Sequence, residues 1–168
     1  ADNELILGLV SVSDRASQGI YEDKGIPALE AWCRKAVKTP VKIHKRLIAD
    51  ERFDIEKTLR ELVDIVGCDL ILTTGGTGFS LRDVTPEATL AVSNRVAPGI
   101  AEAIRAGSMA ITKRAMLSRA VSAIRHRTLI INLPGSPKAV EESLGFVLDT
   151  LPHALGLLRG TDGECGRS

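Results

Sequence analysis

Three short, almost continuous apolar runs constrain the fold more than any other feature of the sequence. They cover residues 5–13 (LILGLVSVS), 69–74 (DLILTT) and 128–133 (TLIINL). Runs of this length predict strands buried on both faces, as in parallel sheets. The segments between them carry apolar residues at helical spacing. Strands separated by helices predict a single α/β domain, with a mainly parallel, doubly wound sheet and helices on both faces.

The intervening segments predict the remaining elements. Residues 41–47 alternate apolar and polar side chains and predict a strand with one wet face. Residues 119–125 are ambiguous, and a strand is favoured. Asp50 stands where it can cap one helix, which Gly67 ends, and Ser136 caps another whose apolar stripe continues to Leu151. We expect one domain over residues 1–159 and a disordered tail over 160–168. The expected helices cover 26–38, the segment before Gly67, 86–94, 98–107, the segment after Ser136, and 152–159.

Composition excludes several classes of protein. Lys+Arg (22) and Asp+Glu (21) nearly cancel, and aromatic residues make up 3% of the chain, so neither bulk charge nor base stacking favours nucleic-acid binding. No apolar run is long enough to span a membrane. The amino end is acidic where a secretory signal is basic. Three cysteines without CxxC spacing read as reduced thiols, and the three histidines lie too far apart for a zinc site. These features predict a cytoplasmic protein.

The strand-to-helix loops are the places to look for a ligand, because parallel sheets bind ligands beyond the carboxyl ends of their strands. One of these loops is Gly75-Gly76-Thr77-Gly78. A glycine-rich turn lets backbone N–H groups approach an anion closely. It is neither a P-loop nor the GxGxxG fingerprint. Spacing alone leaves a plain flexible turn as an equal alternative.

Two acidic residues lie in neighbouring strand-to-helix loops, at the crevice beyond the carboxyl ends of the strands. Asp83, in Arg82-Asp83-Val84-Thr85-Pro86, is suited to Mg²⁺, which uses one or two carboxylates together with substrate phosphates. Its alternative role is an acid at a helix N-terminus. Asp50 is equally placed to clamp a metal–nucleotide complex, with helix capping as its alternative. Arg82 would pair with phosphate or remain a solvated surface charge.

A second candidate anion site follows the strand at 128–133. Pro134-Gly135-Ser136-Pro137-Lys138 combines a capping serine, backbone amides facing the crevice and a positive charge, with capping alone as its alternative. Ser118-Arg119 and Ser13-Asp14-Arg15 are polar groups beside predicted strand ends, and spacing alone gives them no role.

Four segments, taken together, form a pattern specific enough to compare with known families. They are LVSVSDRAS (9–17), TTGGTG (73–78), RDVTPEAT (82–89) and LPGSPKA (133–139). With them the chain resembles the molybdenum-cofactor biosynthesis family, and within it the bacterial Mog-type branch. The resemblance covers about residues 5–159.

The resemblance implies an adenylyltransferase that uses ATP and Mg²⁺ to adenylylate molybdopterin. The two acids important for its activity match Asp50 and Asp83, which are also the expected Mg²⁺ ligands. It further implies a homotrimer, and a product onto which a downstream molybdenum-insertion protein later acts. The residues expected to bind nucleotide or pterin are Ser13, Asp14, Gly75, Gly76, Thr77, Gly78, Arg82, Ser118, Arg119, Pro134, Gly135, Ser136 and Lys138. Two alternatives stay open: a MoaB-like pterin-binding paralogue that transfers AMP poorly, and a non-catalytic scaffold built on the same fold.

Overall fold

The computed structural model describes residues 4–161 and contains one six-stranded sheet, ordered β2-β1-β3-β6-β5-β4. The first four strands in this order are parallel, and β5 and β4 run antiparallel to their neighbours. This confirms the predicted mainly parallel α/β sheet. The strands are β1 (Leu5–Val12), β2 (Val41–Ile48), β3 (Leu70–Thr74), β4 (Arg95–Val96), β5 (Ser122–Arg125) and β6 (Thr128–Leu133).

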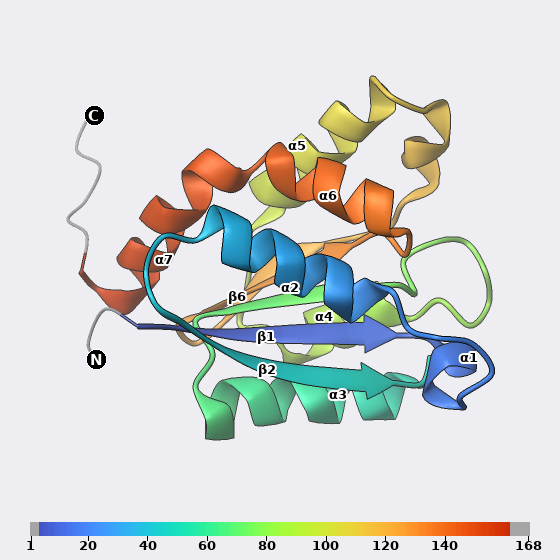
Figure 1. The fold of residues 1–168 in the computed structure, drawn as a ribbon, viewed down its shortest axis with the longest axis horizontal. Coiled ribbons are helices and arrows are strands. Elements are labelled where there is room, and N and C mark those ends of the chain that lie inside the picture. Colours follow the sequence, from blue (N-terminus) through green and yellow to red (C-terminus); the bar gives the residue numbers. More distant parts are fainter. Residues whose placement is uncertain (1–3, 162–168) are drawn as a thin grey trace.

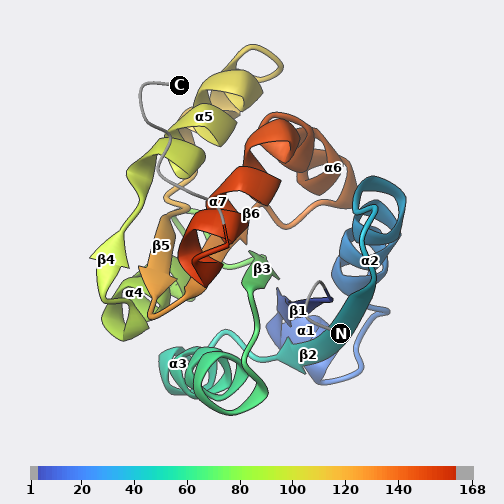
Figure 2. The same cartoon turned by 90° about the vertical axis from the view of Figure 1, so that its left-hand side faces the viewer.

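Helices cover both faces of the sheet, with α2, α5, α6 and α7 on one side and α3 and α4 on the other (Figures 1 and 2). The α-helices are α1 (Asp14–Ser17), α2 (Gly25–Ala36), α3 (Arg52–Glu61), α4 (Thr85–Val92), α5 (Pro98–Met109), α6 (Pro137–Gly145) and α7 (Leu151–Arg159). A π-helical turn, η1 (Leu62–Val66), continues α3, and two 3₁₀ turns are η2 (Lys113–Leu117) and η3 (Leu148–Thr150).

Alternation along the central strands divides the core into two layers. On β1, Leu7 and Leu9 pack with α2, α5, α6 and α7, whereas Val10 and Val12 pack with α3, η1 and α4. Burial on both faces explains why these strands read as continuous apolar runs. The two layers hold the central strands rigidly, so the loops at their carboxyl ends are presented on a fixed frame.

The structure differs from the sequence-based expectations in three places. The two-residue strand β4 was not expected, because Arg95 and Val96 are both exposed and too short to show a pattern. The four-residue helix α1 lies in a segment expected to be a loop. The helix expected to continue to Leu151 ends at Gly145, because the backbone leaves helical geometry at Val147 (φ −121°, ψ 0°), and the turn η3 follows before α7 begins.

The described chain ends just beyond α7. Gly160 closes this helix with φ +79°, and the Thr161 amide donates to the carbonyl of Gly156 at 2.9 Å. The rest of the expected tail, residues 162–168, lies outside the described residues, as does Cys165. Within residues 4–161 no helix is long and apolar enough to cross a membrane.

Candidate active site

The glycine turn lies directly at the carboxyl end of β3 and requires its glycines. Gly75 and Gly76 have φ values of +96° and +69°. A side chain on Gly75 would meet the carbonyl oxygen of Val12 at 2.3 Å. The Thr85 hydroxyl donates to the carbonyl of Gly75 at 3.0 Å, and the Thr85 amide donates to that of Gly76 at 3.1 Å. The first residue of α4 therefore braces the turn in a defined backbone conformation.

Asp50 is bound to the loop after β1. Its Oδ2 accepts the amide of Asp14 at 3.0 Å, and its own amide donates to Oδ1 of Asp14 at 2.9 Å. Its Oδ1 faces the glycine turn, 3.0 Å from where a side-chain carbon on Gly76 would stand. Glu51, not Asp50, is the N-cap residue of α3. The expectation that Asp50 caps this helix is therefore wrong, because the reciprocal bonds to Asp14 hold its carboxylate toward the crevice.

Asp83 is held by its own loop. Its Oδ2 accepts the amides of Gly78 at 3.1 Å and Ser80 at 3.2 Å. The N-cap residue of α4 is Val84, and among the described residues no side-chain bond caps that helix. Asp83 thus fixes the shape of the segment that follows the glycine turn, from a position one residue before the N-cap of α4.

Two arginines tie the crevice loops together. Arg82 donates from Nε and one terminal nitrogen to the carboxylate of Asp14, at 3.0 and 2.9 Å, and pairs with Glu51 at 2.9 Å. This side chain therefore links the loops after β1, β2 and β3. It is half-exposed and therefore accessible from solvent.

Arg119 braces the loop that carries Asp83. Its guanidinium donates to the carbonyls of Gly78 at 2.8 Å and Asp83 at 2.6 Å, and it pairs with the carboxylate of Glu87. Its own amide donates to the carbonyl of Thr77 at 2.8 Å, and Thr77 is buried. Because these bonds occupy its donors within the protein, Arg119 positions the loop in this structure.

The turn after β6 lies beside the glycine turn. A side chain on Gly135 would come within 3.8 Å of the Cα atom of Gly75, and the Thr74 hydroxyl donates to the carbonyl of Pro134. The Ser136 hydroxyl accepts the amide of Ala139 at 3.2 Å, which confirms it as the N-cap of α6. Lys138, in the first turn of α6, is exposed.

The remaining expected residues lie around this centre. Ser13 caps α1 through the amide of Ala16, and its hydroxyl lies 3.0 Å from that of Tyr21. Ser118 accepts the amide of Ala120 and, with Gly78 and Pro134, lines a pocket between α5 and α6. The structure therefore places every predicted site residue at the carboxyl edge of the sheet or on the pocket that opens beside it.

The charged side chains of the site shift the pKa values of Asp14 and Asp50. Hydrogen bonds from Arg82, and then the bond with the backbone of Asp50, hold the pKa of Asp14 below its usual range. Burial raises the pKa of Asp50, and the neighbouring carboxylates of Asp14 and Asp83 add to the rise. A positive charge arriving at this edge would relieve that repulsion.

Sequence reasoning missed some residues that build the site. Asp23 accepts the hydroxyl of Ser11 at 2.7 Å and the amides of Gly25 and Ile26, and so begins α2 beside the crevice. Its place within an acidic loop gave little signal, although an acid just before a helix is a capping pattern. Within residues 4–161 no group of three or more His, Cys, Asp or Glu side chains is arranged to hold a metal ion by itself.

Comparison with known proteins fits this geometry. Residues 8–153 match the family model described as a probable molybdopterin binding domain. The chain is 51% identical to the molybdopterin adenylyltransferase of Escherichia coli K12, over 94% of this chain and 87% of that protein. It is 42% identical to gephyrin of Dictyostelium discoideum, over 94% of this chain but 23% of that protein.

A solved structure agrees over most of the chain. The molybdopterin biosynthesis enzyme MoaB of Thermus thermophilus superposes with a TM-score of 0.85 at 44% identity, covering 93% of this chain and 97% of that one. With the matched family model and these relatives, the chain belongs to the molybdopterin-binding family of molybdenum-cofactor biosynthesis proteins.

Proposed function

We propose that this protein is a molybdopterin adenylyltransferase, which joins the adenylyl group of Mg·ATP to the terminal phosphate of molybdopterin. The observation that carries the proposal is the placement of Asp50 and Asp83 on either side of a rigid glycine turn, next to a second turn suited to anions. The relatives named molybdopterin adenylyltransferase support it through their identity to nearly the whole chain.

The reaction is an attack of one phosphate on another. An oxygen of the molybdopterin phosphate forms a bond to the α-phosphorus of ATP. The bond from that phosphorus to the oxygen bridging to the β-phosphate breaks, and pyrophosphate leaves with the electron pair. Such a transfer needs positioning and charge neutralisation more than covalent help from the protein. The absence of a Cys–His or Ser–His nucleophile among the predicted site residues is consistent with it.

The chain's own residues divide this work. We assign the nucleotide phosphates to the backbone amides of Gly75–Gly78, where the conformation of Gly75 and Gly76 leaves the backbone open to close approach. Arg82 would supply a positive charge from the rim. We assign the terminal phosphate of molybdopterin to the turn of Gly135 and Ser136, with Lys138 beside it, because amides at a helix N-terminus attract anions.

The two acids fit a magnesium ion. Each aspartate is anchored through one oxygen, Oδ2, and the Oδ1 atom of Asp50 faces the glycine turn. Burial, and then repulsion from Asp14 and Asp83, raise the pKa of Asp50, and a cation bound there would offset the repulsion. Two carboxylates suffice for Mg²⁺, which completes its six ligands with phosphate oxygens and water. The bound ion would neutralise phosphate charge.

Further features of the proposal rest on the resemblance. They are a homotrimer, a cytoplasmic location and delivery of the adenylylated pterin to a molybdenum-insertion protein. Analytical ultracentrifugation of the purified chain tests the first: a species of three times the mass of the chain is expected, and a monomer at micromolar concentration would contradict it.

The test of the enzyme assignment is formation of adenylyl-molybdopterin from purified protein, molybdopterin, ATP and Mg²⁺. We expect Asp83→Asn and Asp50→Asn each to lower kcat by roughly a hundredfold or more, because each places metal and phosphate. Asp54→Asn, an acid of α3 outside the site, is the matched control and should retain activity. Pterin binding without product from the wild type would instead favour the MoaB-like paralogue or the scaffold.

A further inference from the structure

The strand β2 forms one end of the sheet and leaves a long outer edge unpaired. It pairs with β1 over all eight of its residues, and the sheet order places no described strand on its other side. Figure 2 shows α2 and α3 on the two faces of the sheet beside it. The edge strand at the opposite end, β4, is only two residues long. A long unpaired edge is a template for pairing with another chain.

The outward-facing backbone groups belong to the odd-numbered residues of β2. The amide of Leu5 donates to the carbonyl of Pro40 at 2.9 Å, and the amide of Ser13 donates to that of Ile48 at 2.9 Å. In a parallel ladder every second residue of a strand bonds to the same neighbour, so the even-numbered residues bond to β1. The four outward amides and carbonyls are those of Val41, Ile43, Lys45 and Leu47.

The segment that carries this edge is strongly basic. Residues 34–46, from the end of α2 into β2, contain six Lys or Arg residues, one His and no Asp or Glu, although the whole chain has 22 Lys+Arg and 21 Asp+Glu. Two acids of the neighbouring helices, Glu30 and Glu61, pair with part of this charge. Lys42 is exposed and makes no ion pair with a described residue. The edge therefore attracts negative charge.

The two faces of β2 differ in their chemistry. Lys42, His44 and Arg46 alternate on the face toward α3, where Arg46 pairs with an acid of that helix. Val41 and Ile43 lie on the opposite face and pack against the core layer of α2. A strand added beside β2 places its side chains next to these on the same two faces. The matching strand has acidic residues on one face and apolar residues on the other.

The same charge disfavours a second copy of this chain as the occupant. Two copies joined through β2 would bring their basic segments together, and like charges on paired strands destabilise a sheet. Charge of one sign on an edge thus rejects one partner and selects another. The partner that it selects is a strand of opposite charge.

We propose that the outer edge of β2 binds an extended, acidic segment of a partner protein, which adds a strand to the sheet. The Arg46 guanidinium donates to the outward carbonyl of Lys45 at 2.9 Å, and a backbone amide of the incoming segment would replace it. Because β2 leads directly to the loop that carries Asp50, the partner would lie beside the candidate active site.

Fluorescence anisotropy with labelled peptides tests the binding. The acidic probe is a peptide as long as β2 in which glutamate and valine alternate. The neutral probe has glutamine in place of glutamate, and the block probe has all its glutamates before its valines. The wild type should bind the acidic probe at least about tenfold more tightly than the other two. An oligomer of deoxythymidine tests for attraction of any polyanion and should bind no more tightly than the block probe.

Hydrogen exchange locates the bound peptide. In the free protein the four outward amides should exchange fast, whereas the amides of the even-numbered residues of β2 are protected by their bonds to β1. Saturation with the acidic probe should slow exchange at the outward amides at least about tenfold and leave the others unchanged. Slow exchange at the outward amides of the free protein would show that another copy covers the edge already, and would overturn the proposal.

Substitutions at Lys45 separate backbone pairing from charge. Lys45→Pro and Lys45→Gln both remove one positive charge, but only the proline removes an outward amide, and it leaves the bonds to β1 in place. Lys45→Pro should therefore bind the acidic probe at least about tenfold more weakly than Lys45→Gln. Continued protection of the even-numbered amides shows that β2 remains folded in each variant.

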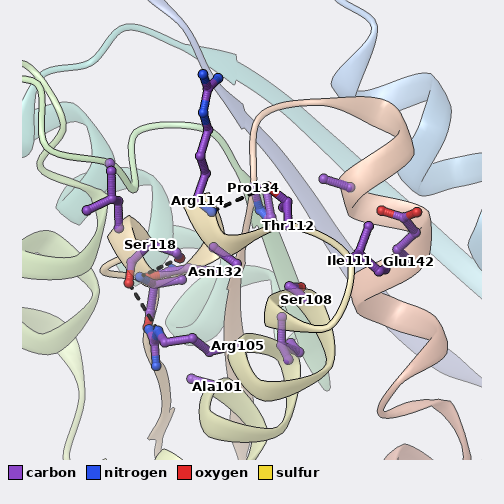
Figure 3. Close-up of a pocket in the computed structure, with 16 residues that line it drawn as sticks. Ala101, Arg105, Ser108, Ile111, Thr112, Arg114, Ser118, Asn132, Pro134 and Glu142 are labelled. Carbon is purple, nitrogen blue, oxygen red and sulfur yellow. Dashed lines mark hydrogen bonds between the residues drawn. The ribbon is translucent and has the colours of Figure 1, made fainter.

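A charge reversal tests the selection of an acidic strand. Lys42→Glu should weaken binding of the acidic probe at least about fivefold and should favour a probe in which lysine and valine alternate. Arg114→Glu makes the same change of charge on η2, beside the pocket shown in Figure 3, and should bind as the wild type does.

Four results would each overturn the proposal. They are failure of the wild type to bind the acidic probe, equal binding of the acidic and block probes, tighter binding of the deoxythymidine oligomer, and equal binding of the acidic probe by Lys45→Pro and Lys45→Gln. The first would show that the charge only protects the edge from pairing. None of these results bears on adenylyl transfer, which is measured separately.

Discussion

Removing the Arg119 guanidinium tests whether the loop carrying Asp83 must be braced. In Arg119→Met the carbonyls of Gly78 and Asp83 lose their donors, and Glu87 loses its ion pair. Each bond to a carbonyl contributes about 1 kcal/mol net. The ion pair, with side chains 33% and 43% exposed, contributes about 0.5 kcal/mol after screening. The free energy of unfolding should therefore fall by about 2–3 kcal/mol.

The same variant should lose activity by more than its stability explains. Displacement of Asp83 by about 1 Å costs on the order of a hundredfold in rate, so we expect kcat to fall roughly 10- to 100-fold at temperatures where the variant is fully folded. Arg119→Lys keeps the charge but cannot fork between two carbonyls, and should recover only a minor part.

Urea unfolding and steady-state kinetics measure the two effects. Arg34→Met removes an exposed arginine paired with Glu30 on α2, and should change the free energy of unfolding by less than about 0.5 kcal/mol. If Arg119→Met matched this control in stability and the wild type in kcat, the loop would hold its shape without the arginine, and the reasoning would be refuted.

Three further perturbations have expected outcomes that the structure sets. Gly75→Ala should cost about 2–4 kcal/mol in urea unfolding, because it places a side-chain carbon against the Val12 carbonyl at positive φ, whereas Gly145→Ala, with open space around it, should cost nothing. Asp50→Asn should be more stable than the wild type at pH 7, because folding raises the pKa of the Asp50 carboxyl and the ionised carboxylate therefore destabilises the folded state. This difference in stability should shrink as the pH falls toward the pKa of Asp50 in the unfolded chain. Equal stability of the two proteins across this pH range would contradict the prediction. Burial raises the pKa of Cys33 and Cys68 to about 12, so site-resolved mass spectrometry should find neither labelled by iodoacetamide at pH 8 until the chain is unfolded in urea.

The sheet was predictable because its central strands are buried on both faces and need no partner to be recognised. The same reasoning failed at β4, where two exposed residues pair with β5 at the edge. It also failed after Gly145, where α6 ends, since the apolar spacing continues to Leu151 while the helical backbone does not.

The site was predictable in its residue types but not in their connections. Chain position put Asp50 at a crevice loop, but capping was the favoured role because Asp14, its actual partner, lies 36 residues away. Arg119 was identified by its neighbourhood, yet its bonds to two carbonyls of the loop depend on how η2 and β5 return to the sheet. Such contacts join residues that are far apart in the chain, so no local spacing pattern in the sequence predicts them.

The most direct measurement of the central claim follows radiolabel from ATP into the pterin. With Mg²⁺ and molybdopterin, the wild type given [α-³²P]ATP should form a labelled pterin, whereas [γ-³²P]ATP should label pyrophosphate alone. Asp83→Asn should form both labelled products at least about a hundredfold more slowly than the wild type. Label from the γ-position in the pterin would show phosphorylation instead, and an unlabelled pterin with both substrates would contradict adenylyl transfer altogether.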